Sequence, residues 1–169
     1  MSTLQLADSA HAYGNESLND LRKDAVHSTA FGLMGAGALL LLTIPITLNV
    51  IPRESWLIAV ALAAVGVITR QALTAGLRWA VAILSVGVSL TIVAAIQLYP
   101  LTPVAGLLGL VVIFTGAFLG WKGSLAAAIG ESALLIALTR LEPQVISPEL
   151  AFFGLLLLWC GAPAGWLLS

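Results

Sequence analysis

The chain has few charged side chains. Only 9% of its 169 residues are Asp, Glu, Lys or Arg, whereas 60% are hydrophobic and the mean hydropathy is +1.05. An ordinary soluble domain is roughly one quarter charged, and a chain this apolar lacks the polar side chains that would cover a water-exposed surface. The composition therefore excludes a water-soluble fold and predicts an integral membrane protein whose apolar surface faces lipid.

Cysteine, excess charge and catalytic motifs are also scarce. The one cysteine, Cys160, lies in an apolar run, so it forms no intramolecular disulfide and we expect it to be a packing residue. The net charge of -1 gives no basic field for nucleic acid. The sequence has no nucleotide-binding glycine loop, no paired catalytic carboxylates and no Ser-His-Asp set, and His27 lacks a metal-ligand partner at suitable spacing. We therefore expect no catalytic residue, cofactor or metal in these residues.

Long apolar runs fill most of the chain. The first is long enough to cross a bilayer, roughly 30 Å at about 1.5 Å per residue. The second is short and crosses only if Arg53 and Arg70 extend from its ends into the headgroups; otherwise it is re-entrant. Turns are predicted where glycine and proline break the helix, as at Lys122-Gly123. The sequence thus predicts an all-α fold, a polytopic transmembrane helical bundle of six short spans joined as hairpins, at about 30–51, 56–69, 79–99, 104–121, 124–139 and 150–169.

A polar segment, residues 1–24, precedes the first apolar run. It contains acidic residues and no early apolar region, so it is not a secretory signal, and we expect the first span to stay in the mature protein. Ser17-Leu18-Asn19-Asp20 resembles a helix capping box, which favours a short amphipathic helix before the membrane. The expected organisation is a cytoplasmic tail at 1–24 and a six-helix transmembrane domain at 25–169.

The basic and aromatic residues predict the orientation. With six spans, Arg53 and Arg140 lie on one side of the membrane, and the other side receives Arg22, Lys23, Arg70, Arg78 and Lys122. Because Lys and Arg are enriched in cytoplasmic loops, both termini are expected in the cytoplasm. The aromatic rings agree with this topology, since they fall at span ends as interfacial rings do: Trp56 and Tyr99 at outer ends, and Trp79, Trp121 and Trp166 at inner ends.

Glu131 is the ionisable residue that lies well inside an apolar span. A carboxyl group in hydrocarbon is costly and marks a candidate functional site, such as a proton or ion relay. Its neighbours one helical turn away are Ala127, Ala128, Leu134 and Leu135, so it is expected to face a partner helix. The alternative is a structural residue, either protonated and hydrogen-bonded across helices or paired with a basic side chain. A relay needs further polar groups at matching depth, and the sequence offers only scattered hydroxyls: Thr43, Ser85, Ser89, Thr91, Thr115 and Ser132.

Proline and small residues interrupt or line several spans. Pro45 and Pro163 are expected to kink the first and sixth spans, because proline removes a backbone donor. Such kinks are hinge candidates and are also common in static membrane helices. Stripes of small residues let helix backbones approach closely, within the bundle or in a dimer. The expected packing residues are Gly116 with Gly120, Gly161 with Gly165, Ser28 with Gly32 and Ala36, and Ala59 with Ala63.

The architecture resembles the N-terminal membrane region of bacterial multi-domain sensor histidine kinases and related signalling proteins. The resemblance lies in a short polar tail, six close helices with minimal loops, the turn Gly120-Trp121-Lys122-Gly123-Ser124, the proline-bearing loop from Leu141 to Pro148, and a last helix that exits inward. It implies that a kinase core follows the last helix, in a bacterial inner membrane. The family's phosphoacceptor histidine and ATP-binding motifs are absent here, so no catalytic residue carries over. The end at Ser169, before any basic anchor, is expected to precede a soluble region.

These observations predict a sensory and anchoring membrane module of a signal-transduction protein, itself non-catalytic. Kinase activity is expected only if a downstream domain supplies it. The alternatives are a small transporter or channel subunit that uses Glu131, and an accessory subunit of a larger membrane complex. The expected partners are the lipid bilayer and either a second copy of the chain or another membrane subunit, without nucleic acid.

Overall fold

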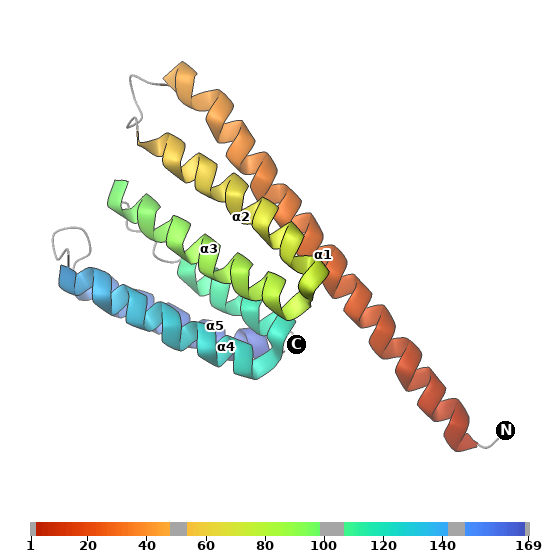
Figure 1. Ribbon diagram of the computed structural model, residues 1–169. Coiled ribbons are helices and arrows are strands. Elements are labelled where there is room, and N and C mark those ends of the chain that lie inside the picture. Colours follow the sequence, from red (N-terminus) through yellow and green to blue (C-terminus); the bar gives the residue numbers. More distant parts are fainter. Residues whose placement is uncertain (1–2, 48–53, 99–106, 142–147, 168–169) are drawn as a thin grey trace.

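The computed structural model describes residues 3–47, 54–98, 107–141 and 148–167, and all of these except Glu54 and Gly76 belong to helices. The five helices are α1 (Thr3–Thr47), α2 (Ser55–Ala75), α3 (Leu77–Leu98), α4 (Leu107–Leu141) and α5 (Pro148–Leu167). Each helix packs on the one before it in the chain, as the row of ribbons in Figure 1 makes visible. The prediction of an all-α fold is confirmed.

Four of these helices are long and apolar enough to cross a membrane. They contain the apolar stretches Ser17–Ile44, Ser55–Ala72, Leu77–Leu98 and Leu107–Arg140, and α5 contains a shorter one, Gly154–Ala164. Large apolar side chains also cover the outer surface: Leu42 is 71% exposed, Phe152 65% and Leu110 60%. Water would not tolerate so much apolar surface, whereas the hydrocarbon core of a bilayer solvates it. The helices therefore indicate an integral membrane protein.

The first helix is much longer than the predicted first span. Its 45 residues run without a break from Thr3 to Thr47, about 67 Å at about 1.5 Å per residue. The single helix α1 thus contains most of the predicted tail and most of the predicted first span. Its N-terminal part protrudes beyond the other helices (Figure 1). Ser17 is not an N-cap, because the helix has begun fourteen residues earlier. Pro45 lies two residues before the end of α1, and its side chain is outside the described part of the chain.

Two of the turns in the described part of the chain are each made by a single glycine. Gly76 separates α2 from α3 with φ 133° and ψ 155°. Gly120 lies inside α4 with φ 73° and ψ -167°, and the chain turns back on itself there (Figure 1). Only glycine readily adopts such dihedral angles, because a Cβ would clash with the backbone. We refer to residues 107–119 and 121–141 as the first and second arms of α4.

The described residues therefore form five helices, and the six predicted spans are not confirmed. The predicted fourth and fifth spans, 104–121 and 124–139, fall in the two arms of α4. The predicted turn at Lys122-Gly123 was wrong, since both residues are helical and the break is at Gly120. The two arms follow one another without a loop, because Gly120 alone, with its positive φ, reverses the chain. Both arms therefore belong to the one element α4.

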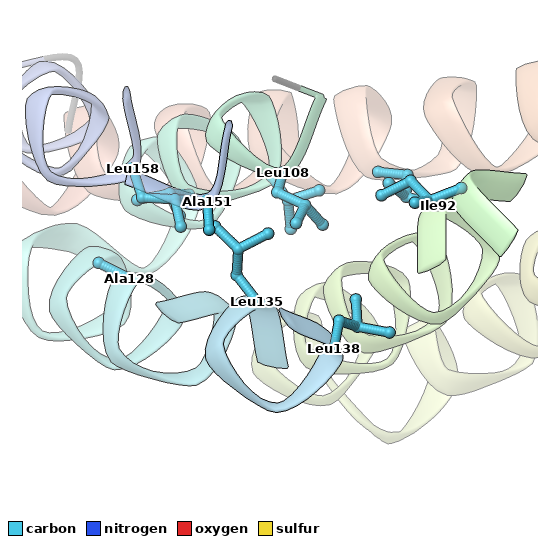
Figure 2. Packing of buried hydrophobic residues seen from close by; sticks show 10 residues of the cluster. Ile92, Leu108, Ala128, Leu135, Leu138, Ala151 and Leu158 are labelled. Atoms are coloured by element: carbon cyan, nitrogen blue, oxygen red, sulfur yellow. The ribbon is translucent and has the colours of Figure 1, made fainter. Parts of the chain in front are cut away.

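Two clusters of buried apolar side chains hold the bundle together. The larger joins α3, both arms of α4 and α5, and Figure 2 labels seven of its members: Ile92, Leu108, Ala128, Leu135, Leu138, Ala151 and Leu158. The smaller joins the first three helices through Val26, Ala72, Ala80 and Val81, with Phe114 and Phe118 of α4 packed beside it. Because α3 contributes to both clusters, it is the helix on which the two halves of the bundle meet.

Close backbone contact joins α1 to α2. A Cβ on Gly37 would lie 2.6 Å from the Ala59 carbonyl oxygen, and one on Gly66 would lie 2.6 Å from the Ala30 carbonyl oxygen. Ala59 is fully buried, so the small residues predicted in the second span lie at this contact. The stripe predicted in the first span, Ser28, Gly32 and Ala36, is exposed, so it does not pack within the bundle, and its alternative role in a dimer stays a prediction.

The other predicted packing glycines have different surroundings. Gly116 is buried in the first arm of α4. Gly161 lies against that arm, since a Cβ there would be 3.3 Å from the Gly109 carbonyl oxygen. Gly120 is at the break, and a Cβ there would meet no atom within 4 Å, so its backbone conformation rather than packing requires glycine. The surroundings of Gly165 lie outside the described part of the chain. Pro163 is exposed and lies within α5, which remains helical to Leu167.

Candidate intramembrane site around Glu131

Glu131 lies in the second arm of α4 and is 7% exposed. Its helical neighbours Ala128 and Leu135 are fully buried, so the face that carries the carboxyl group points into the bundle. As predicted from its neighbours, this face meets a partner helix, which is α3. The carboxyl group therefore lies among helices rather than in lipid.

Three hydroxyl groups gather beside the carboxyl group. The Ser89 hydroxyl hydrogen-bonds Glu131 Oε1, and its oxygen is also 2.8 Å from the Ser85 carbonyl oxygen. One turn away, Ser85 Oγ and Thr115 Oγ1 are 2.7 Å apart, and Thr115 Oγ1 donates to the Val111 carbonyl oxygen at 2.7 Å. Because Thr115 uses its proton on that carbonyl, Ser85 must be the donor in the Ser85–Thr115 bond. The result is a polar cluster of one carboxyl and three hydroxyl groups, drawn from three helical segments.

The hydrogen count around Ser89 shows how the cluster adapts to a proton. A serine hydroxyl has one hydrogen, and the Ser85 carbonyl oxygen only accepts. If Glu131 is ionised, Ser89 donates to the carboxylate; if Glu131 is protonated, the carboxylic acid donates to Ser89 and Ser89 donates to the carbonyl. The same positions of Ser85, Ser89 and Glu131 therefore keep the hydrogen bond between Ser89 and Glu131 Oε1 in both protonation states of the carboxyl group.

The second carboxyl oxygen is the feature of the cluster that lacks a partner. Glu131 Oε2 is buried, and no described residue lies within hydrogen-bonding distance of it. Buried polar atoms in proteins are nearly always paired, so an exception calls for a specific explanation such as a water molecule or a ligand. Within the described ranges no basic side chain forms an ion pair with Glu131. The expected alternative of a salt bridge thus has no support from these residues.

A cavity of about 400 Å³ lies next to this polar cluster. Its walls are mostly apolar, with Val86 and Leu90 from α3 and Leu119 and Leu134 from α4. Val86 and Leu90 are 60% and 57% exposed, so the cavity opens on the lipid-facing surface between α3 and α4. Small-molecule sites typically have volumes of about 300–1,000 Å³, apolar walls and a few polar groups. The cavity has this form, with Glu131 and the hydroxyl groups as its polar part.

The local sequence explains why these groups meet. Ser85 and Ser89 are four residues apart, so they share one face of α3. Thr115 comes five residues before the break at Gly120, and Glu131 comes eleven residues after it. Because the chain reverses at Gly120, both arms of α4 present their polar residue to that face. Alanine and glycine at Ala82, Ala126, Ala127, Gly123 and Gly130 leave the volume unfilled.

The sequence predicted Glu131 as the candidate residue, but it did not predict the hydroxyl groups and the cavity around it. Of the hydroxyls treated as scattered, Ser85, Ser89 and Thr115 come together with Glu131. The spacing of the two serines was the available signal. The remaining three hydroxyls bond to carbonyl groups of their own helices, Thr43 to Leu40, Thr91 to Gly87 and Ser132 to Ala128.

Metal ligands do not gather in the part of the chain that the structure describes, where no group of three His, Cys, Asp or Glu side chains is placed to hold an ion. Cys160 is a free, exposed thiol on α5. Comparison of the chain with protein-family models, with curated proteins and with solved structures gives no match.

Proposed function

We propose that the chain is the non-catalytic sensory and anchoring module of a membrane signal-transduction protein, and that it senses a small, largely apolar molecule bound beside Glu131. The observation that carries this proposal is the buried, unpartnered Oε2 of Glu131, a residue that lines an apolar cavity of about 400 Å³. A ligand with one hydroxyl or amine group would donate a hydrogen bond to that oxygen and bury its remaining surface against leucine, valine and alanine.

Entry from the bilayer follows from the position of the cavity. Its opening lies among exposed apolar side chains of α3 and α4, which face lipid in an integral membrane protein. A molecule dissolved in the hydrocarbon core would reach the cavity without crossing water. This route suits a sensor of membrane-soluble compounds, and it does not suit a solute pathway, which needs polar groups along its whole length.

For the topology, we propose six crossings with the two arms of α4 counted separately and both termini in the cytoplasm of a bacterial cell. Support comes from the charges. Arg22, Lys23, Arg78 and Lys122 lie near the end of the bundle that contains Gly76 and Gly120, whereas Arg140 lies in the last turn of α4, at the far end of its second arm. An excess of basic residues on one side of the membrane favours that side as cytoplasmic.

For the output, α1 is the candidate connection. Its continuous helix joins a polar segment outside the apolar stretch to the face that packs on α2, so a shift of α2 or α3 on ligand binding would displace the segment outside the membrane. The choice of a histidine kinase as the attached output domain rests on the resemblance of the architecture alone.

The proposed site is tested by chemical labelling in lipid nanodiscs. An apolar carbodiimide, dicyclohexylcarbodiimide, partitions into lipid and adds to a protonated carboxyl group as a stable acylurea, which peptide mass spectrometry locates. We expect modification at Glu131 by this reagent, and modification at the exposed Glu54 but not at Glu131 by a water-soluble carbodiimide. An absence of labelling at Glu131 by the apolar reagent would contradict access from the bilayer.

The second candidate function is a small transporter or channel subunit built on Glu131. The adaptable hydrogen bonds around Ser89 favour it, because they accommodate both protonation states. It predicts that Glu131→Gln abolishes a solute or proton flux in proteoliposomes while the helical content stays unchanged. A flux of wild-type size in this variant, or none in the wild type, would leave the sensory function as the better account.

A further inference from the structure

A second, larger cavity lies at the end of the bundle where the chain makes its two single-residue turns. Its volume is about 1100 Å³, and its lining comes from α1, the α2–α3 turn and both arms of α4. It shares only Leu119 and Gly123 with the cavity beside Glu131, and its polar groups are different. The two cavities are therefore separate candidate sites.

Cationic side chains converge on this cavity from three helices. Arg22 comes from α1, Arg78 from α3 and Lys122 from the second arm of α4, and none of the described residues that line the cavity is acidic. Asp20, close to the cavity wall on α1, forms an ion pair at 3.5 Å with Lys23, which is not a lining residue. Arg78 and Lys122 alone place two positive charges in one hollow whose described walls hold no carboxylate, an arrangement that attracts anions.

The backbone adds to the positive potential of the cavity. The helix of α3 begins at Leu77 after Gly76, and the second arm of α4 begins at Trp121 after Gly120. Both glycines line the cavity. The free N–H groups of a helix N-terminus attract anions, and glycine in the capping position offers no side-chain oxygen to satisfy them. With no Cβ on either glycine, an anion has room to approach these N–H groups.

We propose that this cavity binds a phosphate group, held by Arg78 and Lys122, with Arg22 in the wall beside them. Arginine forks match phosphate oxygens in pairs, and lysine adds a compact charge. Trp79 also lines the cavity and is 67% exposed, as expected of a ring at the level of the headgroups. The phosphate belongs either to an anionic phospholipid or to a water-soluble phosphate compound, and both would approach this end of the bundle. The proposal does not depend on the Glu131 site.

The test measures thermal unfolding of the full chain in neutral detergent by circular dichroism at matched ionic strength. The additions are phosphatidylglycerol, phosphatidylcholine and inorganic phosphate, each titrated separately. Stabilisation that saturates with phosphatidylglycerol and not with phosphatidylcholine assigns the site to lipid, and stabilisation by inorganic phosphate assigns it to a soluble compound. If neither anion stabilises the protein more than phosphatidylcholine does, the proposal is overturned.

Variants that remove one positive charge distinguish anion binding in this cavity from general electrostatic attraction of anions to the protein. Arg78→Gln and Lys122→Gln remove lining cations, and Arg140→Gln removes an exposed cation at the opposite end of α4. A charge-assisted hydrogen bond contributes about 1.5–3 kcal/mol, so each lining variant should bind the stabilising anion about tenfold or more weakly, with wild-type affinity in Arg140→Gln. Equal weakening in all three variants would overturn the proposal. Should a lining variant unfold, Arg22→Gln tests the same cavity from α1.

Discussion

Replacing Gly120 by alanine tests how the two arms of α4 are brought together. At φ 73° and ψ -167°, this residue occupies a backbone region that is essentially restricted to glycine, where a side chain costs on the order of 1–3 kcal/mol. A Cβ would meet no atom within 4 Å, so crowding adds nothing and the whole cost arises from the backbone. We therefore expect Gly120→Ala to lower the free energy of unfolding by about 1–3 kcal/mol.

Gly130→Ala is the matched control for this substitution. Gly130 lies in the same helix and is exposed, and a Cβ added there would also meet no atom within 4 Å, but its backbone is helical. Alanine in a helix interior is favoured over glycine by about 0.8–1.0 kcal/mol, so this variant should be at least as stable as the wild type. The assay is unfolding by sodium dodecyl sulfate in mixed micelles, followed by circular dichroism. Equal stability of the two variants would refute the reversal at Gly120.

Further substitutions test the helix contacts. Gly37→Ala should destabilise the protein by about 1–3 kcal/mol, because its Cβ would lie 2.6 Å from the α2 backbone. Gly35→Ala places its Cβ in open space and should not destabilise the protein. Similar unfolding of the two variants would contradict the α1–α2 contact. Ser85→Ala removes the interhelical bond to Thr115 and should cost about 0.6 kcal/mol, up to about 1.7. Ser132→Ala removes a bond within one helix and should cost less, as measured by the same unfolding titration.

The helical membrane character of the fold was predictable from composition, because apolar runs of this length have few other solutions. The places where helices end were less predictable. Gly120 and Gly123 are both glycines that can break a helix, and the turn was predicted at Gly123 whereas the break is at Gly120. Nothing local distinguishes them, since the choice depends on which break lets both arms pack on α3. Similarly, Gly32 and Gly37 both offer a small surface on α1, and only the contact with Ala59 selects Gly37.

The candidate site was predictable in part. Glu131 stands out in any apolar span, so its selection needed no structure. Its partners did not stand out, because serine and threonine are common in membrane helices and most of them bond to their own backbone. The meeting of Ser89 with Glu131 joins residues 42 positions apart and depends on the reversal at Gly120. A cavity is a property of packing, and no sequence pattern marks where side chains fail to fill a space.

Native mass spectrometry of protein extracted from its own membranes in nanodiscs tests whether a small molecule binds beside Glu131. We expect the wild type to retain a compound small enough for a cavity of about 400 Å³, and Ser132→Ala to retain it equally. Glu131→Leu keeps the helix and removes the polar group, so it should lose the compound. Identical small-molecule content in the wild type and in Glu131→Leu would contradict the claim.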